Sequence, residues 1–220
     1  MGSGIGPIGQ GIEDLVIRID ALNIRTGTGS TLSSLVNDIK LVTSGILISS
    51  FSGQNVYSFS GAGFVTSQTN TGVSGTQSRT MSCWVRFGSK ANQGILATGA
   101  NGAGTGMALG TSTTVFLLGY GNAGVATTIT YAANTWYHLT YVSEYTNGTS
   151  HRVKLYVNGG IAHSAIVSGI NLTDSTLRIG MDQSGLGFSG YISRTSFHKK
   201  VLSDDEIIKT FWNYKSRFGL

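Results

Sequence analysis

Alternating apolar and polar positions recur along most of the chain and predict many short β-strands. In the clearest run, residues 79–87, every second side chain from Met81 to Phe87 is apolar, and the residues between them include Trp84. Successive side chains of a strand point to opposite faces, so we expect the odd-numbered set to be buried. Shorter runs predict strands at 14–20, 56–59, 94–97, 106–109, 114–118, 126–131, 134–142, 175–180 and 188–199, with one or two more in 39–49 after a polar loop at 26–38.

A tight hairpin is predicted where the alternating residues 151–157 are followed at once by Asn158 and Gly159. Asn-Gly supplies two residues that tolerate positive φ, which a two-residue hairpin turn requires. The partner strand is therefore expected at 161–167.

The hydrophobic period changes to that of a helix near the C-terminus. Ser203 and Glu206 have the spacing of a capping box, in which each side chain bonds to the other residue's backbone N–H. A helix as short as the one predicted, at about 203–213, is unstable alone in water, so we expect it to pack on the strands with Trp212 buried. Its apolar face consists of Ile207, Ile208, Phe211 and Trp212.

The amino-acid composition, together with the predicted strands, indicates the fold class. The chain has 32 glycines and one proline, and small polar residues fill the gaps between the apolar runs. Hydrophobic residues make up 40% and charged residues 11%, so the high charge and low hydrophobicity of a disordered chain are absent. Many short strands separated by such turns predict an all-β antiparallel sandwich of two sheets over residues 12–220, behind a Gly-rich arm at 1–11.

The net charge of +5 does not by itself predict a nucleic-acid partner. Phosphate binding needs Lys and Arg clustered on one face, whereas the densest basic stretch here, 194–217, is interrupted by acids at 204–206. The N-terminus lacks the basic segment followed by an apolar segment that is typical of an export signal. No apolar run approaches the roughly 18 residues of a membrane span. We therefore expect neither nucleic acid nor a membrane as partner, and synthesis in a cytoplasm.

The ionisable residues predict no strong metal site and no nucleophile. Cys83 is the one cysteine, which excludes an internal disulfide, and its apolar neighbours predict a buried small hydrophobe. The four histidines lack the spacing of metal ligands. Asp182 is the best single donor for calcium, with a turn-stabilising aspartate as the alternative, and no other cofactor is expected.

Candidate chemistry on carbohydrate points to binding and not to cleavage. Glycoside hydrolysis needs two carboxyl groups about 5 to 9.5 Å apart, and the ten acidic residues include no Glu-x-Asp or Glu-x-x-x-Glu set. We therefore predict that the protein is not an enzyme. Binding would use aromatic and amide side chains, for which Tyr120 and Asn122 are the candidates, whereas Trp84 and Trp136 are expected in the core or on a sheet face.

Several segments carry motifs beyond their alternation: 134–139, 153–159, 177–180, 188–194 and 202–207. Together they resemble the laminin-G-like domains of the concanavalin A-like lectin/glucanase superfamily, which implies a jelly-roll sandwich closed by a helix. Residues 20–23, 56–61 and 213–220 resemble the version common in tailed-phage virion proteins. The similarity covers about residues 12–220.

The chain departs from this family at positions that often carry acids. Ser193 and Arg194 stand where members often have an acidic pair, and Gly61 stands where phage-type members often have an aspartate. Leu32 replaces a tryptophan that is common in the phage version. The comparison implies fewer acidic groups that hold calcium.

The resemblance implies a non-enzymatic structural protein of a tailed-phage virion: a surface decoration, a fibre, or a neck or tail accessory subunit, assembled in the host cytoplasm. The alternative is a glycan-binding module that recognises a host cell surface. Ordering the glycines of the arm costs about 1–2 kcal/mol per residue. Ile5, Pro7 and Ile8 are the arm side chains able to bury useful area, so they are predicted to anchor the chain to further copies of itself or to other virion proteins.

Overall fold

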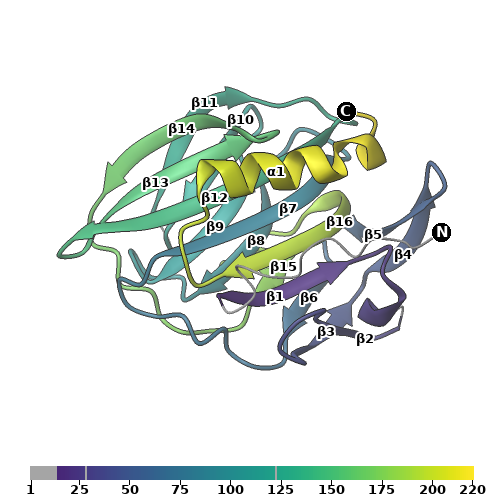
Figure 1. Ribbon diagram of the computed structural model, residues 1–220, viewed down its shortest axis with the longest axis horizontal. Helices are drawn as coiled ribbons and strands as arrows, with labels where there is room; N and C mark the ends of the chain where they lie inside the picture. The colour runs from purple at the N-terminus through teal and green to yellow at the C-terminus, as the bar shows by residue number, and fades with distance from the viewer. Residues whose placement is uncertain (1–13, 28, 122) are drawn as a thin grey trace, which may run out of the picture.

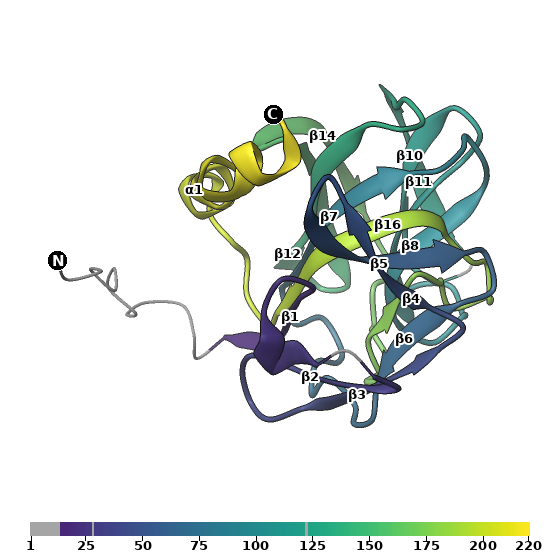
Figure 2. The same cartoon turned by 90° about the vertical axis from the view of Figure 1, so that its right-hand side faces the viewer.

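Two antiparallel sheets face each other in the computed structural model, which describes residues 14–27, 29–121 and 123–220 (Figure 1). Each sheet has eight strands, and one helix lies outside the first sheet, so that three layers are visible side by side in Figure 2. This architecture confirms the predicted all-β sandwich with a C-terminal helix. The predicted boundary between residues 11 and 12 lies outside the described residues.

The first sheet, called sheet A, has the order β14-β13-β12-β7-β16-β5-β4, with β1 paired to the C-terminal half of β16. Its strands are β1 (Leu15–Asp20), β4 (Leu47–Phe51), β5 (Gln54–Ser60), β7 (Arg79–Phe87), β12 (Trp136–Asn147), β13 (Ser150–Val157), β14 (Gly160–Val167) and β16 (Ser189–His198). The second sheet, called sheet B, has the order β11-β10-β9-β8-β15-β6-β3-β2. Its strands are β2 (Thr31–Ser33), β3 (Lys40–Ser44), β6 (Phe64–Ser67), β8 (Gln93–Gly99), β9 (Gly106–Thr111), β10 (Val115–Gly119), β11 (Gly124–Thr130) and β15 (Arg178–Ile179). The helices are η1 (Ile24–Thr26), α1 (Asp204–Tyr214) and η2 (Lys215–Phe218).

The main core fills the space between the sheets. On β7, Met81 and the apolar side chains that alternate after it are fully buried there, as predicted. Trp84, on the opposite side of β7, is 1% exposed, which agrees with its expected place in the core or on a sheet face. α1 and η2 cover that side of sheet A and build a second, smaller core from Val56, Trp84, Trp136 and Phe218.

The hairpin between β13 and β14 is confirmed. Asn158 and Gly159 have φ values of 53° and 84°, the left-handed conformations that the Asn-Gly turn predicted. Gly159 is required for a second reason: a Cβ there would lie 3.1 Å from Cβ of Phe211, which packs above the turn.

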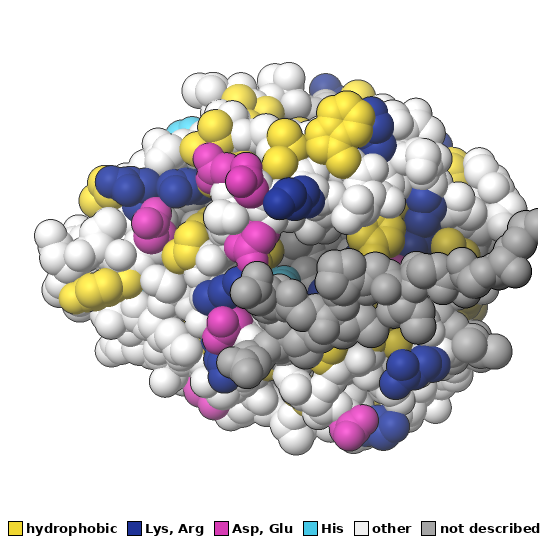
Figure 3. Space-filling model, in the orientation of Figure 1, with side chains coloured by type: hydrophobic (Ala, Val, Ile, Leu, Met, Phe, Trp, Pro, Cys, Tyr) yellow, Lys and Arg dark blue, Asp and Glu magenta, His cyan; other side chains and the backbone are white. Residues whose placement is uncertain are grey.

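The helix starts as predicted but turns a different face to the sheet. Ser203 caps α1 and forms both hydrogen bonds of the capping box with Glu206. The prediction that Trp212 is buried is wrong: its side chain is 58% exposed, and Figure 3 shows hydrophobic side chains uncovered over α1. The face that packs on sheet A carries Ile207 and Phe211, spaced four apart, and η2 continues it with Phe218. No helix within the described ranges is long and apolar enough to cross a bilayer.

Three short elements differ from the prediction. The polar loop predicted at 26–38 contains β2, and β6 was not predicted at all. The strand predicted at 175–180 is reduced to the two residues of β15. These strands are so short that alternation has little room to show itself.

Candidate ligand groove

The outer face of sheet B holds an open groove of about 480 Å³. β8, β9, β10 and β11 form its floor, and the loop that follows β15 forms one wall. The described residues that line it are Gln93, Gly94, Asn101, Ala108, Gly110, Thr111, Leu117, Gly119, Gly121, Ala123, Gly124, Ala126, Asp182, Gln183, Ser184 and Leu186.

The groove exists because the outward side chains of its floor are small. Met107 and Leu109 point into the main core, so Ala108 between them and Gly110 after Leu109 face outward. The same holds on the two neighbouring strands, where the outward positions that line the groove include Gly119, Gly124 and Ala126. Side chains of this size leave the backbone of the sheet close to solvent, and a ligand can approach it directly.

Gly94 lets the wall of the groove pack tightly on β8. A Cβ at this position would lie 2.4 Å from the backbone nitrogen of Asp182 and 2.6 Å from the carbonyl oxygen of Leu186. Any larger residue would push the 181–187 loop away from the sheet. The depth of the groove therefore depends on this glycine.

The wall loop is held in one conformation by hydrogen bonds of its own. Asp182 Oδ1 accepts from the backbone N–H of Ser184 (2.8 Å), from Ser184 Oγ (2.7 Å) and from the backbone N–H of Leu186 (2.9 Å). Gln183 Nε2 donates to the carbonyl oxygens of Thr98 and Met107, both at 2.8 Å. These bonds tie the loop to β8 and β9, so its polar groups are positioned before any ligand arrives.

The predicted site residues fall in different places. Asp182 lines the groove and has the turn-stabilising role that the sequence left as an alternative. Tyr120 packs against the main core and is not among the lining residues. Asn122 lies outside the described residues, as do Ile5, Pro7 and Ile8, so the roles predicted for all of these stay predictions.

Sequence reasoning missed the floor of the groove, because it searched for side chains and the floor is made by their absence. A signal was nonetheless present. Residues 106–111 alternate small and large, Gly-Met-Ala-Leu-Gly-Thr, and small residues recur at 119, 124 and 126. Three neighbouring strands with a small outward set indicate a hollow on that face of the sheet.

The described part of the chain contains no group of three or more His, Cys, Asp or Glu side chains that could hold a metal ion. Asp182 as a calcium donor therefore stays a prediction from the sequence. At the positions where family members often carry an acidic pair, the side chains of Ser193 and Arg194 both bond to other protein groups.

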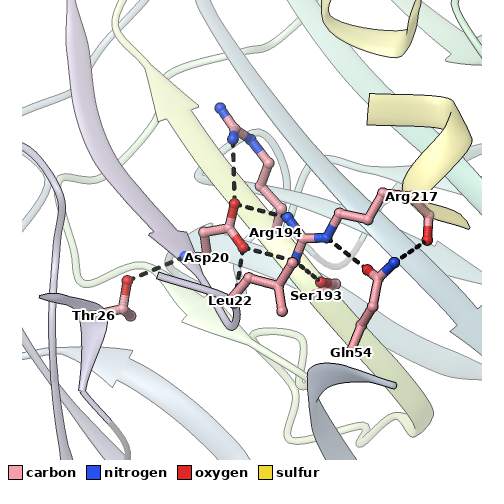
Figure 4. A network of polar contacts seen from close by, with 7 residues as sticks. All are labelled: Asp20, Leu22, Thr26, Gln54, Ser193, Arg194 and Arg217. Carbon is pink, nitrogen blue, oxygen red and sulfur yellow. Dashed lines mark hydrogen bonds and ion pairs between the residues drawn. The ribbon is translucent and has the colours of Figure 1, made fainter. Parts of the chain in front are cut away.

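Those groups form a buried ionic network at the edge of sheet A (Figure 4). Asp20 receives two hydrogen bonds from Arg217, at 3.0 and 2.8 Å, and one from Arg194 at 3.3 Å. Burial alone would raise the pKa of Asp20, but the hydrogen bond and charge of Arg217 outweigh it, and the pKa is lowered. Arg217 also bonds to Ser193 and Gln54, so the network is satisfied internally and serves to hold η2 on the sheet.

Two histidines each lie within hydrogen-bond distance of a serine hydroxyl, and all four side chains are buried. His138 Nε2 lies 2.9 Å from Ser82 Oγ, and His151 Nδ1 lies 2.9 Å from Ser143 Oγ. Burial lowers the pKa of His138 to about 3, and no carboxylate bonds to either imidazole within the described residues. Cys83 is buried as predicted, and its burial raises the pKa of the thiol.

Comparison with known proteins assigns the chain to a family and identifies structures that share its fold. The family model described as the concanavalin A-like lectin/glucanases superfamily matches residues 59–208, more than half of the chain. No curated protein is significantly similar in sequence.

Solved structures share the fold at low sequence identity. Domain 4 of AbnA, a GH43 extracellular arabinanase from Geobacillus stearothermophilus, in complex with arabinotriose, is 17% identical with a TM-score of 0.64, covering 89% of this chain and 97% of that one. A structure of botulinum neurotoxin type C is 15% identical with a TM-score of 0.68. The cell entry of that toxin is described as dependent on interaction with two ganglioside molecules. The binding domain of botulinum neurotoxin DC with rat synaptotagmin II is 16% identical with a TM-score of 0.67. The match covers 92% of this chain but only 52% of either toxin chain, so this chain corresponds to about half of each.

Proposed function

Because this chain belongs to the concanavalin A-like lectin/glucanase superfamily, we propose that it is a carbohydrate-binding module whose ligand lies in the groove on sheet B. The observation that carries the proposal is the hollow itself. One outer face of the sandwich is open, is floored by small residues and is walled by a loop that is already fixed.

The size and lining of the groove fit a small glycan. Ligand pockets are typically about 300 to 1,000 Å³ with mostly apolar walls and a few fixed polar groups, and this groove of about 480 Å³ has Leu117 and several alanines beside Asn101 and Asp182. Two structural neighbours support the class of ligand, since the arabinanase domain was solved with arabinotriose and the type C toxin is described with gangliosides.

A pair of substitutions on one strand tests the site. Ala126 lines the groove and Thr128 does not, yet both are exposed on β11. Ala126→Trp should fill the groove and weaken binding at least about tenfold, a loss of about 1.4 kcal/mol, whereas Thr128→Trp should bind like the unmodified chain.

The measurement is titration calorimetry with neutral oligosaccharides, arabinotriose first. Equal binding by the Ala126→Trp variant would place the ligand elsewhere on the molecule. If no oligosaccharide of a broad panel binds the unmodified chain, the proposed function is wrong.

The structural role in a tailed-phage virion stays a second proposal, which rests on the resemblance of residues 20–23, 56–61 and 213–220. The two roles are compatible, since a module displayed on a particle can also bind a cell-surface glycan. Removal of residues 1–11 should leave a folded domain that no longer forms the oligomers expected of the full chain, as measured by light scattering. Unchanged assembly would refute the anchoring role of Ile5, Pro7 and Ile8.

A further inference from the structure

We infer that the groove on sheet B selects uncharged glycans and rejects acidic ones; this inference rests on the proposed function. Among the described residues that line the groove, Asp182 is the one that carries a charge. The side-chain atoms that the 181–187 loop leaves free beside it are acceptors, whereas the Asn101 amide elsewhere in the lining can both donate and accept. A ligand that fits must therefore supply hydrogen-bond donors and no negative charge.

The hydrogen bonds of the wall loop show which atoms are left for a ligand. All three bonds that the Asp182 carboxylate accepts within the described structure end on Oδ1, which leaves Oδ2. Both amide hydrogens of Gln183 are used by backbone carbonyls, which leaves its Oε1. Ser184 Oγ gives its hydrogen to Asp182, which leaves its lone pairs.

These three acceptors match the chemistry of a sugar hydroxyl. A hydroxyl group can donate to a carboxylate or an amide oxygen, whereas an ionised carboxylate or sulfate can only accept. An acidic glycan would thus bring a second set of acceptors and a like charge to Asp182. Like charges placed together across an interface weaken binding by more than one tenfold step in Kd.

The overall charge of the chain acts in the opposite direction but over a longer range. A net charge of +5 attracts anions to the molecule as a whole. Exposed charges are largely screened beyond about 8 Å at physiological ionic strength, whereas Asp182 lies in the groove itself. The nearby Arg178 is not a lining residue, and its Nη1 lies 3.4 and 3.5 Å from the carbonyl oxygens of Asp182 and Gln183. The local charge is therefore expected to decide selectivity.

The test compares matched neutral and acidic probes on four forms of the full chain. The probes are lactose with sialyllactose, and trigalactose with trigalacturonate, titrated at 0.15 M salt. Asp182→Asn removes the charge but keeps the oxygen that holds the turn, because asparagine makes the same turn. Asp174→Asn is the control, since Asp174 also holds a turn, by accepting from the backbone N–H of Gly72 at 2.9 Å, but lies outside the groove.

We expect the unmodified chain and Asp174→Asn to bind each acidic probe at least about tenfold more weakly than its neutral partner. Asp182→Asn should remove most of this difference in Kd between the acidic and neutral probes. Leu186→Lys is a second variant, at a lining position that is 40% exposed, and it should strengthen binding of the acidic probes.

Each other outcome overturns a different statement. Equal binding of acidic and neutral probes by the unmodified chain would refute the selectivity while leaving glycan binding intact. A gap that Asp182→Asn and Leu186→Lys both leave unchanged would refute the role of the groove charge. Absence of binding by every probe would refute the proposed function and this inference together.

Discussion

The outer face of sheet A is covered by helices, whereas the outer face of sheet B is open. The outer face of sheet A carries large side chains such as Trp84, Trp136 and His138, and α1 and η2 cover them. The outer face of sheet B carries Ala108, Gly110 and their small neighbours along β9 to β11, and it stays open as the groove. The size of the outward side chains thus decides whether a face becomes a second core or stays an open groove.

The physical reason is the area that a cover can bury. The ring of Phe218 stacks on Trp84 with centroids 4.1 Å apart and lies 4.7 Å from Trp136. Aromatic side chains bury about 150 to 250 Å² each, enough to stabilise a short helix that is unstable alone. Glycine and alanine offer no comparable area, so no segment of the described chain is held over the floor of the groove.

The largest loss of stability is expected from breaking the ion pairs that hold the cover, the helical segment α1 and η2, on sheet A. Asp20→Asn should destabilise the domain by about 3 to 5 kcal/mol, because it leaves Arg194 and Arg217, whose side chains are only 13% and 12% exposed, without their anion. Urea unfolding measures the loss. The matched control is Glu144→Gln, which breaks a more exposed pair with Lys154 and should cost less than about 1 kcal/mol. Equal losses would mean that the network does not hold the cover.

A slightly smaller effect is expected from the cover itself. Phe218→Ala removes a ring that is 9% exposed and should cost about 3 kcal/mol, the lower end for a buried aromatic. The binding affinity of the groove should be unchanged, because sheet B lies on the other side of the molecule (Figure 2). A loss of less than about 1 kcal/mol in the free energy of unfolding would show that the packing of η2 in the second core contributes little to stability.

The sequence predicted those features of the fold that depend on residues close together in the chain. The alternation of β7, the Asn158-Gly159 turn and the Ser203 capping box each follow from contacts within a few residues. Alternation alone cannot tell that both faces of a strand are covered, so the burial of the even-numbered face of β7 does not follow from its pattern.

Contacts between distant segments were also beyond the sequence. Asp20 and Arg217 are 197 residues apart in the chain, and nothing local relates them. The helix shows the same limit: its apolar residues form one broad stripe, and it is Phe211 that stacks on the distant Trp84, while Trp212 stays exposed.

Acid should weaken the covered face gradually. Burial lowers the pKa of His138 from 6.5 to about 3, and that of His198 from 6.5 to about 3. The unfolded chain therefore binds protons that the folded chain does not, between about pH 6.5 and 3, and stability falls as the pH falls through that window. The slope is about 1.4 kcal/mol per pH unit for each such histidine.

His138→Gln isolates this contribution. The variant should show a smaller loss of stability between pH 6.5 and 4, by about one proton in the pH dependence of urea unfolding. An unchanged slope would mean that His138 is protonated in the folded domain, which its burial beside the rings of Trp84 and Phe211 argues against.

The smallest effect is expected at the aromatic side chain that the sequence placed in the core. Trp212 is 58% exposed, and its main contact is the ammonium group of Lys215, which lies 3.5 Å from the ring centroid. An exposed cation–π pair contributes about 0.5 to 1 kcal/mol, so Trp212→Ala should cost no more than about 1 kcal/mol in urea unfolding, against about 3 for Phe218→Ala. The two substitutions remove aromatic rings six residues apart, and only one of those rings lies between the helix and the sheet. A loss of 3 kcal/mol or more at Trp212 that grew with protein concentration would show that its ring is buried against a second copy in solution, and the outer side of α1 would then be a third kind of face, covered only on assembly.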